Sequence, residues 1–497
     1  MGQIALNPGT YAEMERMFNP RSIVVVGVSA TGNLYGSGMV TGLRMFGYDG
    51  TIYAVHHKGG HYDGMPVYRS VDEIPAEKID FAIICIAASH VPEALEACRR
   101  KGAAGAEILS AGFRELGTAE GIALEEKLKA IAARGIRVVG PNCFGIYCPQ
   151  GGLTLLPGPD LSRKAGPVAF LAQSGGMAID FAASGRWMGL DFSKVVSFGN
   201  GVDLRETELL AYLGDDPQTK VIAMYMEGLA DGDGFVTTLK QVAQEKPVII
   251  YKGGLSTAGQ RAVTSHTASL GGSRVIWESV LRQCNAVQVQ GMWEMAQTCL
   301  AFARLPIRPY RGIAVIGGGG ALGVAACDAA EENGLILPVL RPDLQEKILA
   351  VLPKPGSSAG NPVDVASPII DPAVLKEVLT QAAQDECIDA LILIELIYHY
   401  KHMAMRMGVK SVKEIVPYLD LADVVSEVVA TMDKPVIVVL PNQKRDREYM
   451  DIEEMIREAR DAFLARGIPV YDDLEAALRA LGRVSRYAAQ RARPARA

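Results

Sequence analysis

The chain has 497 residues, of which 49% are hydrophobic and 21% charged, and it carries a net charge of −6 at pH 7. This length exceeds what one hydrophobic core supports, so two to four domains are expected, and the acidic balance argues against a general nucleic-acid surface. No apolar run reaches the ~18 residues that a transmembrane helix needs, and the first ten residues lack the charged and apolar regions of a signal peptide.

The first 150 residues alternate buried strands with amphipathic helices. A glycine-rich segment, 29–38, separates the first strand from a helix that contains Met39, Leu43 and Phe46. Strand, glycine loop, helix and strand in this order predict the opening of a Rossmann-like parallel sheet, although the segment lacks the GxGxxG spacing. The predicted strands are residues 22–28, 51–55, 80–87, 106–110 and 136–139, and the later helices are residues 91–101 and 120–133.

The loops after these strands are predicted to line one crevice, because such sheets bind ligands at the carboxyl ends of their strands. Segment 29–38 offers backbone amides at a helix N-terminus, an arrangement that suits a phosphate. After the second strand the sequence reads His56-His57-Lys58, with no acidic residue placed to bind a ribose. The lysine suits a phosphate-rich ligand, and a solvated basic turn is the alternative. The other crevice loops are residues 87–89, 111–113 and 141–143.

A second series begins after a glycine- and proline-rich linker, 151–166. Its predicted strands are residues 168–172, 195–198, 221–226 and 247–251. The small residues 173–177 start a helix and suit a phosphate, with a tight packing turn as the alternative. His266 is predicted on a Gly/Ser/Thr-rich loop that ends at a helix beginning near Ser273. The loops after these strands can share one sheet edge, which makes a candidate site of Ser174, Asn200, Asp203, Glu227 and His266.

A third series starts after Pro306–Pro309. Its predicted strands are residues 312–316, 390–394 and 435–440, and its helices include residues 325–332 and 474–481. The glycine turn 317–323 indicates either phosphate binding or close packing of a strand on a helix. The sequence therefore predicts three successive α/β domains, with limits 1–150, 151–305 and 306–497.

No metal site is predicted. The eight cysteines are scattered, and even the closest pair, Cys143 and Cys148, lacks the paired spacing of a zinc site, so reduced thiols in a cytoplasmic protein are expected. His399 and His402 are three residues apart, but two histidines alone are a weak metal signal. The surrounding segment, 398–412, has no predicted role; a specificity insertion and a subunit contact are both open.

Five motifs together resemble one known family. They are GPNCFGI, AQSGGM, SFGNGVD, YMEG and KGG…GQRAVTSHTASLGG. The chain resembles the α subunit of NDP-forming (ADP-forming) acyl-CoA synthetases, the acetate–CoA ligase family, kin of succinyl-CoA synthetase α. The specific motifs cover residues 20–305, and a looser likeness continues to about 480. SHTASLGG departs from the usual SHTG and LAG of the family, but Ala268 and Gly272 keep these positions small.

The resemblance implies a fold and a reaction. The fold is α/β, with an N-terminal Rossmann-like CoA-binding domain and two flavodoxin-like, doubly wound domains. The reaction is that of an acid–thiol ligase, which converts ATP, a carboxylic acid and CoA reversibly into acyl-CoA, ADP and phosphate. A phosphohistidine relays the phosphoryl group. Because no part of the sequence reads as an ATP-grasp domain, the resemblance also implies a separate β subunit that supplies ATP or ADP with Mg²⁺, and hence a hetero-oligomer.

The resemblance also assigns roles to residues. His266 carries the phosphoryl group, Glu227 orients its imidazole, and the backbone at Ser174, Gly175 and Gly176 cradles the phosphate. A pocket near Asn200, Asp203 and the loops of the third domain is expected to select the acid. The residues implied to bind CoA are Ser29, Thr31, Asn33, Lys58, Ala87, Ala88, Gly112, Phe113, Asn142 and Cys143.

Two other functions are compatible with the sequence. The missing nucleotide domain favours a CoA-dependent acyl or carbamoyl transferase that reuses the fold without ATP. A CoA-binding regulatory protein with an inactive site is the second alternative. The intact pair of His266 and Glu227 argues against the transferase, because transfer alone needs no phosphohistidine.

Overall fold

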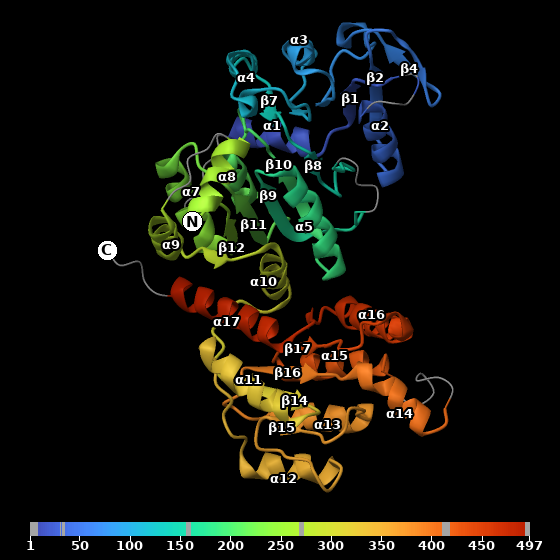
Figure 1. Cartoon of the computed structure of the whole chain (residues 1–497), viewed down its shortest axis with the longest axis vertical. Coiled ribbons are helices and arrows are strands. Elements are labelled where there is room, and N and C mark those ends of the chain that lie inside the picture. Colours follow the sequence, from blue (N-terminus) through green and yellow to red (C-terminus); the bar gives the residue numbers. More distant parts are fainter. Residues whose placement is uncertain are drawn as a thin grey trace. The chain divides into compact units, whose positions relative to one another are not determined.

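The computed structural model of the chain describes residues 8–29, 31, 35–155, 161–267, 273–409 and 418–492. The chain divides into two compact units, Met1–Cys299 and Leu300–Ala497. Each unit is built from central sheets covered by helices (Figure 1). Within the described ranges, no helix combines the length and the apolar character that a membrane span requires.

The first sheet has seven strands in the order β3-β4-β2-β1-β5-β6-β7, and all neighbours are parallel except β3 and β4. The strands are β1 Ser22–Val26, β2 Thr51–Val55, β3 Gly60–Tyr62, β4 Met65–Tyr68, β5 Phe81–Ile84, β6 Gly105–Ile108 and β7 Arg137–Val139. The helices are α1 Pro8–Phe18, α2 Tyr35–Phe46, α3 Val91–Arg100 and α4 Ala119–Ala132. The predicted strands and helices are confirmed, whereas α1 and the β3–β4 hairpin were not predicted.

The second sheet has six strands in the order β13-β12-β11-β9-β10-β8, with β8 antiparallel to β10. The strands are β8 Gly145–Tyr147, β9 Ala165–Ala172, β10 Phe192–Ser197, β11 Val221–Met226, β12 Val248–Lys252 and β13 Val287–Val289. The helices are α5 Gly175–Trp187, α6 Glu206–Asp215, α7 Gly232–Glu245, α8 Thr257–Thr267, α9 Arg274–Gln283 and α10 Met292–Arg304. β8 precedes residue 150, so a strand from the first sequence series completes the second sheet.

Helix α8 corrects one prediction. The backbone around His266 was predicted to be a loop, but it is helical up to Thr267. The Ser256 hydroxyl accepts a hydrogen bond from the Gly259 N–H at 3.0 Å, which satisfies a donor of the first turn. Val263 is 6% exposed and lies over Gly254, so its burial anchors the helix. Residues 268–272 lie outside the described part of the chain.

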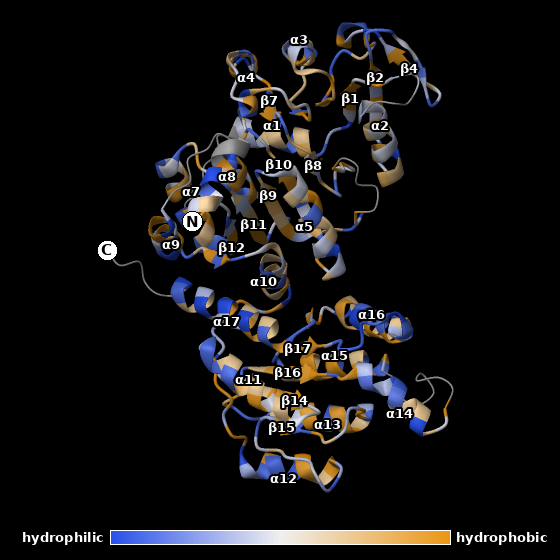
Figure 2. Ribbon diagram, in the orientation of Figure 1, coloured by the Kyte–Doolittle hydropathy of each residue, from blue (hydrophilic) through white to orange (hydrophobic). Residues whose placement is uncertain are grey.

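The third sheet is fully parallel, in the order β15-β14-β16-β17-β18. Its strands are β14 Ile313–Gly317, β15 Val363–Asp364, β16 Ala390–Ile394, β17 Val436–Val439 and β18 Val470–Tyr471. Its helices are α11 Gly320–Glu332, α12 Pro342–Val351, α13 Pro372–Ala383, α14 Tyr400–Arg406, α15 Asp420–Met432, α16 Met450–Ala465 and α17 Leu474–Arg491. Figure 2 shows hydrophobic residues concentrated in β14, β16 and β17, as expected for strands covered on both faces.

The glycine turn of the third sheet is a packing feature. A Cβ on Gly317 would lie 2.8 Å from the Ile394 carbonyl oxygen, and one on Gly318 would lie 2.8 Å from the Ser367 carbonyl oxygen. The Gly319 N–H at the start of α11 donates to Asp364 Oδ1 at 3.4 Å. Because a carboxylate already occupies this helix N-terminus, the contacts favour close packing over phosphate binding.

Candidate active site

The carboxyl edge of the second sheet is organised by Gln173, which directly follows β9. Its side-chain oxygen accepts hydrogen bonds from the N–H groups of Glu227 and Gly228, and its side-chain nitrogen donates to the Gly228 carbonyl at 3.1 Å. The side chain is only 5% exposed. A single buried amide therefore fixes the start of the loop after the neighbouring strand, β11.

Glu227 is held beneath this edge. Its side chain is 4% exposed, and Oε1 accepts a hydrogen bond from the Tyr225 hydroxyl at 3.1 Å. Lys252, at the end of β12, donates from Nζ to the Glu227 carbonyl oxygen at 2.7 Å and lies 5.3 Å from the centre of the Trp277 ring. Burial lowers the pKa of Lys252 to about 8, against an opposing attraction from Glu227. The carboxylate thus has a fixed position in a partly desolvated environment.

The N-terminus of α5 opens next to this carboxylate loop. Ser174 is the N-cap and accepts a hydrogen bond from the Met177 N–H at 3.5 Å. Gly175 lies against Phe144, since a Cβ there would be 2.7 Å from the ring, whereas a Cβ on Gly176 would meet no described atom within 4 Å. Both interpretations of this turn therefore hold in part: Gly175 is needed for packing, and Gly176 leaves the helix start accessible to an anion.

The backbone of α8 brings His266 to the junction of the first two sheets. α8 lies beside the short 3₁₀ helix η3, Arg114–Leu116, which belongs to the first sheet series. The side chain of His266 lies outside the described part of the structure.

Asn200 forms hydrogen bonds across the same junction between the first two sheets. Its side-chain nitrogen donates to Glu115 Oε2 at 2.6 Å and to Glu125 Oε2 at 2.9 Å, and its oxygen accepts from the Asn142 amide at 3.4 Å. The other Glu115 oxygen accepts from the Gly112 N–H at 2.6 Å. Burial opposes ionisation of Glu115, but the hydrogen bonds from Asn200 and the loop amides outweigh it and lower the pKa of this carboxyl.

Replacing Asn200 with alanine is expected to lower the free energy of unfolding of the first unit by about 1–3 kcal/mol, because two carboxylates lose a shared donor. A carboxyl whose pKa is lowered on folding stabilises the fold above its unfolded pKa, and this contribution disappears as the pH falls. The difference from the wild type, measured by urea unfolding, should therefore be smaller at pH 4 than at pH 7. An equal difference at both pH values would contradict this account.

Asp203 also connects the first two sheets. Its oxygens accept hydrogen bonds from Arg137 Nε at 2.9 Å, from Arg137 Nη2 at 3.1 Å and from the Val138 N–H at 2.8 Å. These bonds join the loop after β10 to β7 of the first sheet. The predicted role of Asp203 in binding the acid stays a prediction, and its contacts are those of a structural ion pair.

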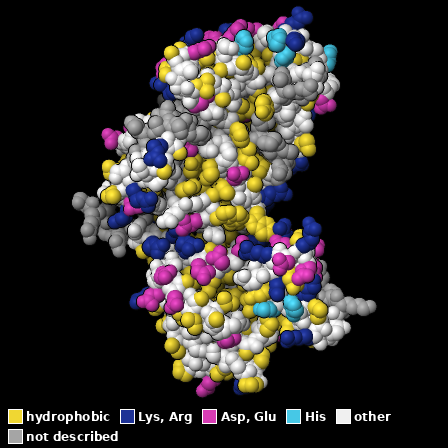
Figure 3. Space-filling view, in the orientation of Figure 1, with side chains coloured by type: hydrophobic (Ala, Val, Ile, Leu, Met, Phe, Trp, Pro, Cys, Tyr) yellow, Lys and Arg dark blue, Asp and Glu magenta, His cyan; other side chains and the backbone are white. Residues whose placement is uncertain are grey.

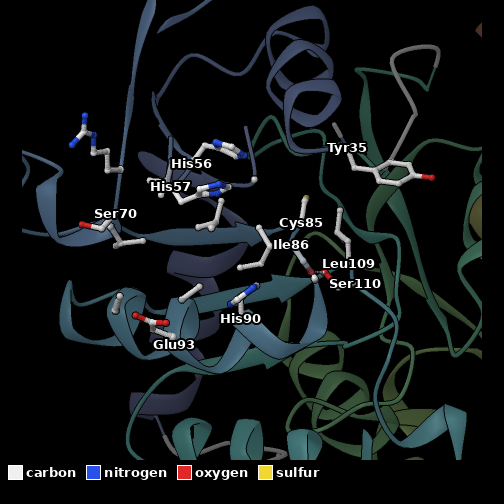
Figure 4. A pocket seen from close by; sticks show the side chains of 18 of the residues that line it. Tyr35, His56, His57, Ser70, Cys85, Ile86, His90, Glu93, Leu109 and Ser110 are labelled. Carbon is white, nitrogen blue, oxygen red and sulfur yellow. Dashed lines mark hydrogen bonds between the residues drawn. The ribbon is translucent and has the colours of Figure 1, made fainter. Parts of the chain in front are cut away.

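A cavity of about 1600 Å³ lies at the carboxyl ends of β1, β2, β5 and β6 (Figure 4). Of the residues predicted to bind CoA, Ala87, Asn142 and Cys143 line it. Polar lining residues that were not proposed as ligands include His56, His57, Arg69, Ser70, His90 and Ser110. The run His56-His57 was the sequence signal that could have identified them.

The other described residues that were predicted to bind CoA do not line this cavity. Lys58 is exposed, and its N–H donates to His56 Nδ1 at 3.3 Å. Ser29 and Thr31 hydrogen-bond to each other through their hydroxyls at 2.7 Å. The other residues of this group are Ala88 in a 3₁₀ turn, Gly112 and the fully buried Phe113, whereas Asn33 lies outside the described residues. The described residues contain no group of three or more His, Cys, Asp or Glu that could hold a metal ion.

Comparison with known proteins matches each sheet to a family model. A CoA-binding domain covers residues 21–149, a succinyl-CoA ligase-like flavodoxin domain covers residues 165–302, and a Ligase-CoA domain covers residues 313–488. The three sheets therefore define a CoA-binding, ligase-type chain.

Individual related proteins define this class more closely. The chain is 38% identical over 358 residues to the alpha subunit of an ADP-forming acetate–CoA ligase I of Pyrococcus furiosus, covering 71% of this chain and 76% of that protein. It is 30% identical over 489 residues to an ADP-forming acetate–CoA ligase II of Archaeoglobus fulgidus, covering 97% of this chain and 68% of that protein. The chain belongs to the family of ADP-forming acetate–CoA ligases.

A solved structure agrees with this assignment. The fold matches an acetyl-coenzyme A synthetase 1 of Ca. Korarchaeum cryptofilum, solved in complex with phosphate and ADP, with a TM-score of 0.80 and 28% identity. The match covers 96% of this chain and 97% of that one. The α/β fold class, with its CoA-binding and flavodoxin-like parts, is thereby confirmed.

Proposed function

We propose that the chain is the α-type component of an NDP-forming acid–CoA ligase that works through a phosphohistidine at His266. The observation that supports the proposal is the arrangement of the carboxyl edge of the second sheet. The buried Glu227 and the open helix start at Ser174–Gly176 lie at this edge, and the helix α8 that carries His266 lies beside η3 of the part that holds the 1600 Å³ cavity. A nucleophile, its orienting carboxylate, an anion site and a CoA site are the components this reaction needs.

The proposed reaction has three transfers. A neutral imidazole nitrogen of His266 attacks the terminal phosphoryl group of ATP, so that an N–P bond forms, the bond to the bridging oxygen breaks and ADP leaves. A carboxylate oxygen of the acid then attacks the phosphorus, which breaks the N–P bond and yields an acyl phosphate. Finally the CoA thiolate attacks the acyl carbon, the thioester forms and phosphate leaves. Each step is reversible.

The residues of this chain position these transfers. Glu227 holds the imidazole in one tautomer, with its own position set by Tyr225 and by the backbone bonds from Gln173. The start of α5 faces the charge on the phosphoryl group with free amides and a positive dipole. Lys252 holds the loop that carries Glu227 through its hydrogen bond to the Glu227 carbonyl oxygen. Asn200 and Asp203 lie at the same junction, and selection of the acid near them remains part of the proposal.

Loading of His266 is assigned to an ATP-grasp β subunit, which would bind ATP or ADP with Mg²⁺ in a hetero-oligomer. Support comes from the Pyrococcus relative, which is named as an alpha subunit. We keep the domain limits 1–150, 151–305 and 306–497, with β8 as a strand shared across the first limit. The eight free cysteines support a cytoplasmic location.

Labelling with ATP that carries γ-³²P tests the proposal. The chain, together with an ATP-grasp partner, should acquire an acid-labile label, and His266→Ala should abolish it. His61→Asn is a matched control, because His61 is an exposed histidine on the edge strand β3. A label that persists in His266→Ala would refute the phosphohistidine. CoA binding without any label would favour the transferase or the regulatory protein.

A further inference from the structure

Three of the chain's seven histidines line the CoA-domain cavity. His56 and His57 follow β2, and His90 ends the 3₁₀ turn before α3. Figure 4 shows the three rings reaching the cavity from two sides, and Figure 3 shows histidine side chains gathered over α3, β2 and β4. Imidazole is the side chain whose charge changes between pH 5 and 8, so this end of the cavity has a charge that depends on pH.

The first two histidines form a close pair. The centres of the His56 and His57 rings are 4.3 Å apart. Partial burial, and then repulsion from His57 and Lys58, lowers the pKa of His56 below its ordinary value. An anion placed beside the His56 ring would oppose this lowering and favour the protonated imidazole.

Arg69 brings a permanent positive charge to the same end. The His56 N–H donates to the Tyr68 carbonyl oxygen at 2.9 Å, which places the end of β4 beside the pair. Among the described residues, the Arg69 guanidinium makes no ion pair or hydrogen bond, although its backbone N–H donates to Glu73. Arg69 lines the same cavity as the two imidazoles, and a guanidinium together with imidazoles suits a phosphate group.

Other charges around the pair do not neutralise it. Asp72 is engaged with Arg100, Nη2 to Oδ2, at 2.8 Å. Glu93 lies on α3, one turn after His90, and Lys58 adds positive charge next to the pair. The side chains that face the histidines thus leave a net positive end once the imidazoles are protonated.

We propose that His56, His57 and Arg69 form a phosphate clamp that binds the nucleotide phosphates of CoA and takes up protons as it does so. This inference rests on the proposed function, because it assumes that CoA occupies the cavity. The ligand raises the pKa values of the imidazoles, so the gain in affinity is complete below their free values and is lost as the pH rises through their bound values. CoA therefore binds more tightly at pH 6 than at pH 8.

Calorimetric titration of the full-length chain with CoA and with pantetheine, which lacks the phosphates, tests the clamp. CoA affinity should rise roughly tenfold from pH 8 to pH 6, a change equivalent to one pKa unit. Pantetheine affinity should stay constant. Titrations in two buffers of different ionisation enthalpy should show proton uptake with CoA. A phosphate monoester itself titrates at about pH 6. The change of CoA affinity with pH is therefore compared between the wild type and the variants.

The double variant His56→Asn/His57→Asn should bind CoA with the same affinity at pH 6 and pH 8 and should take up no protons. Its binding of pantetheine should be unchanged. Arg69→Gln should weaken CoA binding at both pH values and keep the pH dependence, and His61→Asn should match the wild type. A double variant that binds CoA with the wild-type pH dependence would overturn the clamp while leaving CoA binding intact. Failure of the wild type to bind CoA at either pH would overturn the proposed function together with the clamp.

Discussion

Glu227→Gln is expected to reduce phosphorylation of the chain by at least about 100-fold, the scale seen when a carboxylate that orients a reactive imidazole becomes an amide. The structure holds this carboxylate in one place, with Tyr225 on Oε1, Gln173 on its backbone N–H and Lys252 on its carbonyl oxygen. The amide keeps the shape of the side chain but lacks the negative charge with which the carboxylate accepts a hydrogen bond from the imidazole N–H. Initial rates of labelling from γ-³²P ATP, with the partner in excess, measure the effect.

Two companion measurements separate orientation from folding. CoA binding should be unchanged in Glu227→Gln, because the cavity is lined by residues of the first sheet series. Tyr225→Phe removes one hydrogen bond from the carboxylate and should reduce labelling by only a few-fold. Unchanged labelling in Glu227→Gln would remove Glu227 from the mechanism and leave His266 to be oriented by another group.

Asp216→Asn is expected to destabilise the first unit by about 3–5 kcal/mol, because it leaves Lys194 charged and unpaired in the interior. Lys194 Nζ lies 2.8 Å from Asp216 Oδ2, and the two side chains are only 3% and 4% exposed. The ammonium also lies 5.7 Å and 5.5 Å from the ring centres of Phe18 and Tyr212. Urea unfolding followed by tryptophan fluorescence measures the loss.

The pH dependence of this variant gives a second check. Burial opposes ionisation of Asp216, but hydrogen bonds from Lys194 and Thr219 outweigh it and lower the pKa of the carboxyl. The stabilisation is therefore present above the unfolded pKa of about 3.9 and is lost as the pH falls. The difference in free energy of unfolding between the variant and the wild type should therefore be smallest at acidic pH. Lys164→Met, which breaks the exposed pair with Asp191, is the control and should cost at most about 1 kcal/mol.

Helix α1 packs next to this ion pair. Phe18 of α1 stacks on Tyr212 of α6 with ring centres 4.9 Å apart, while Arg16 of α1 pairs with Asp80 of the first sheet at 3.0 Å. α1 thus contacts elements of both sheet series of the first unit. The sequence did not predict α1, because its mixed polar pattern has meaning only once two surfaces are present for it to bridge.

The strands illustrate what local sequence can predict. Runs such as Phe81–Ile84 and Ala390–Ile394 are short and apolar on both faces, a pattern typical of buried parallel strands. The helix around His266 shows the opposite case. Its Gly, Ser and Thr residues favour a loop locally, yet burial of Val263 over Gly254 holds the segment in a helix. Tertiary packing overrides weak propensity there.

By itself the sequence determined the alternation of strands and helices, the three sheets and the residue types of the candidate site, since these follow from hydrophobic period and from short motifs. Only the tertiary structure decided how the polar residues are used. Asp203 and Asn200 lie on the expected loops, but Asp203 bonds to Arg137 of β7, and Asn200 bonds to Glu115 of η3 and Glu125 of α4. Likewise, His56 lines a cavity because β2 pairs with β4, which brings residues after both strands to the same place. Hydrogen bonds and charge pairs join residues far apart in the chain, so their partners are set by packing and not by local pattern.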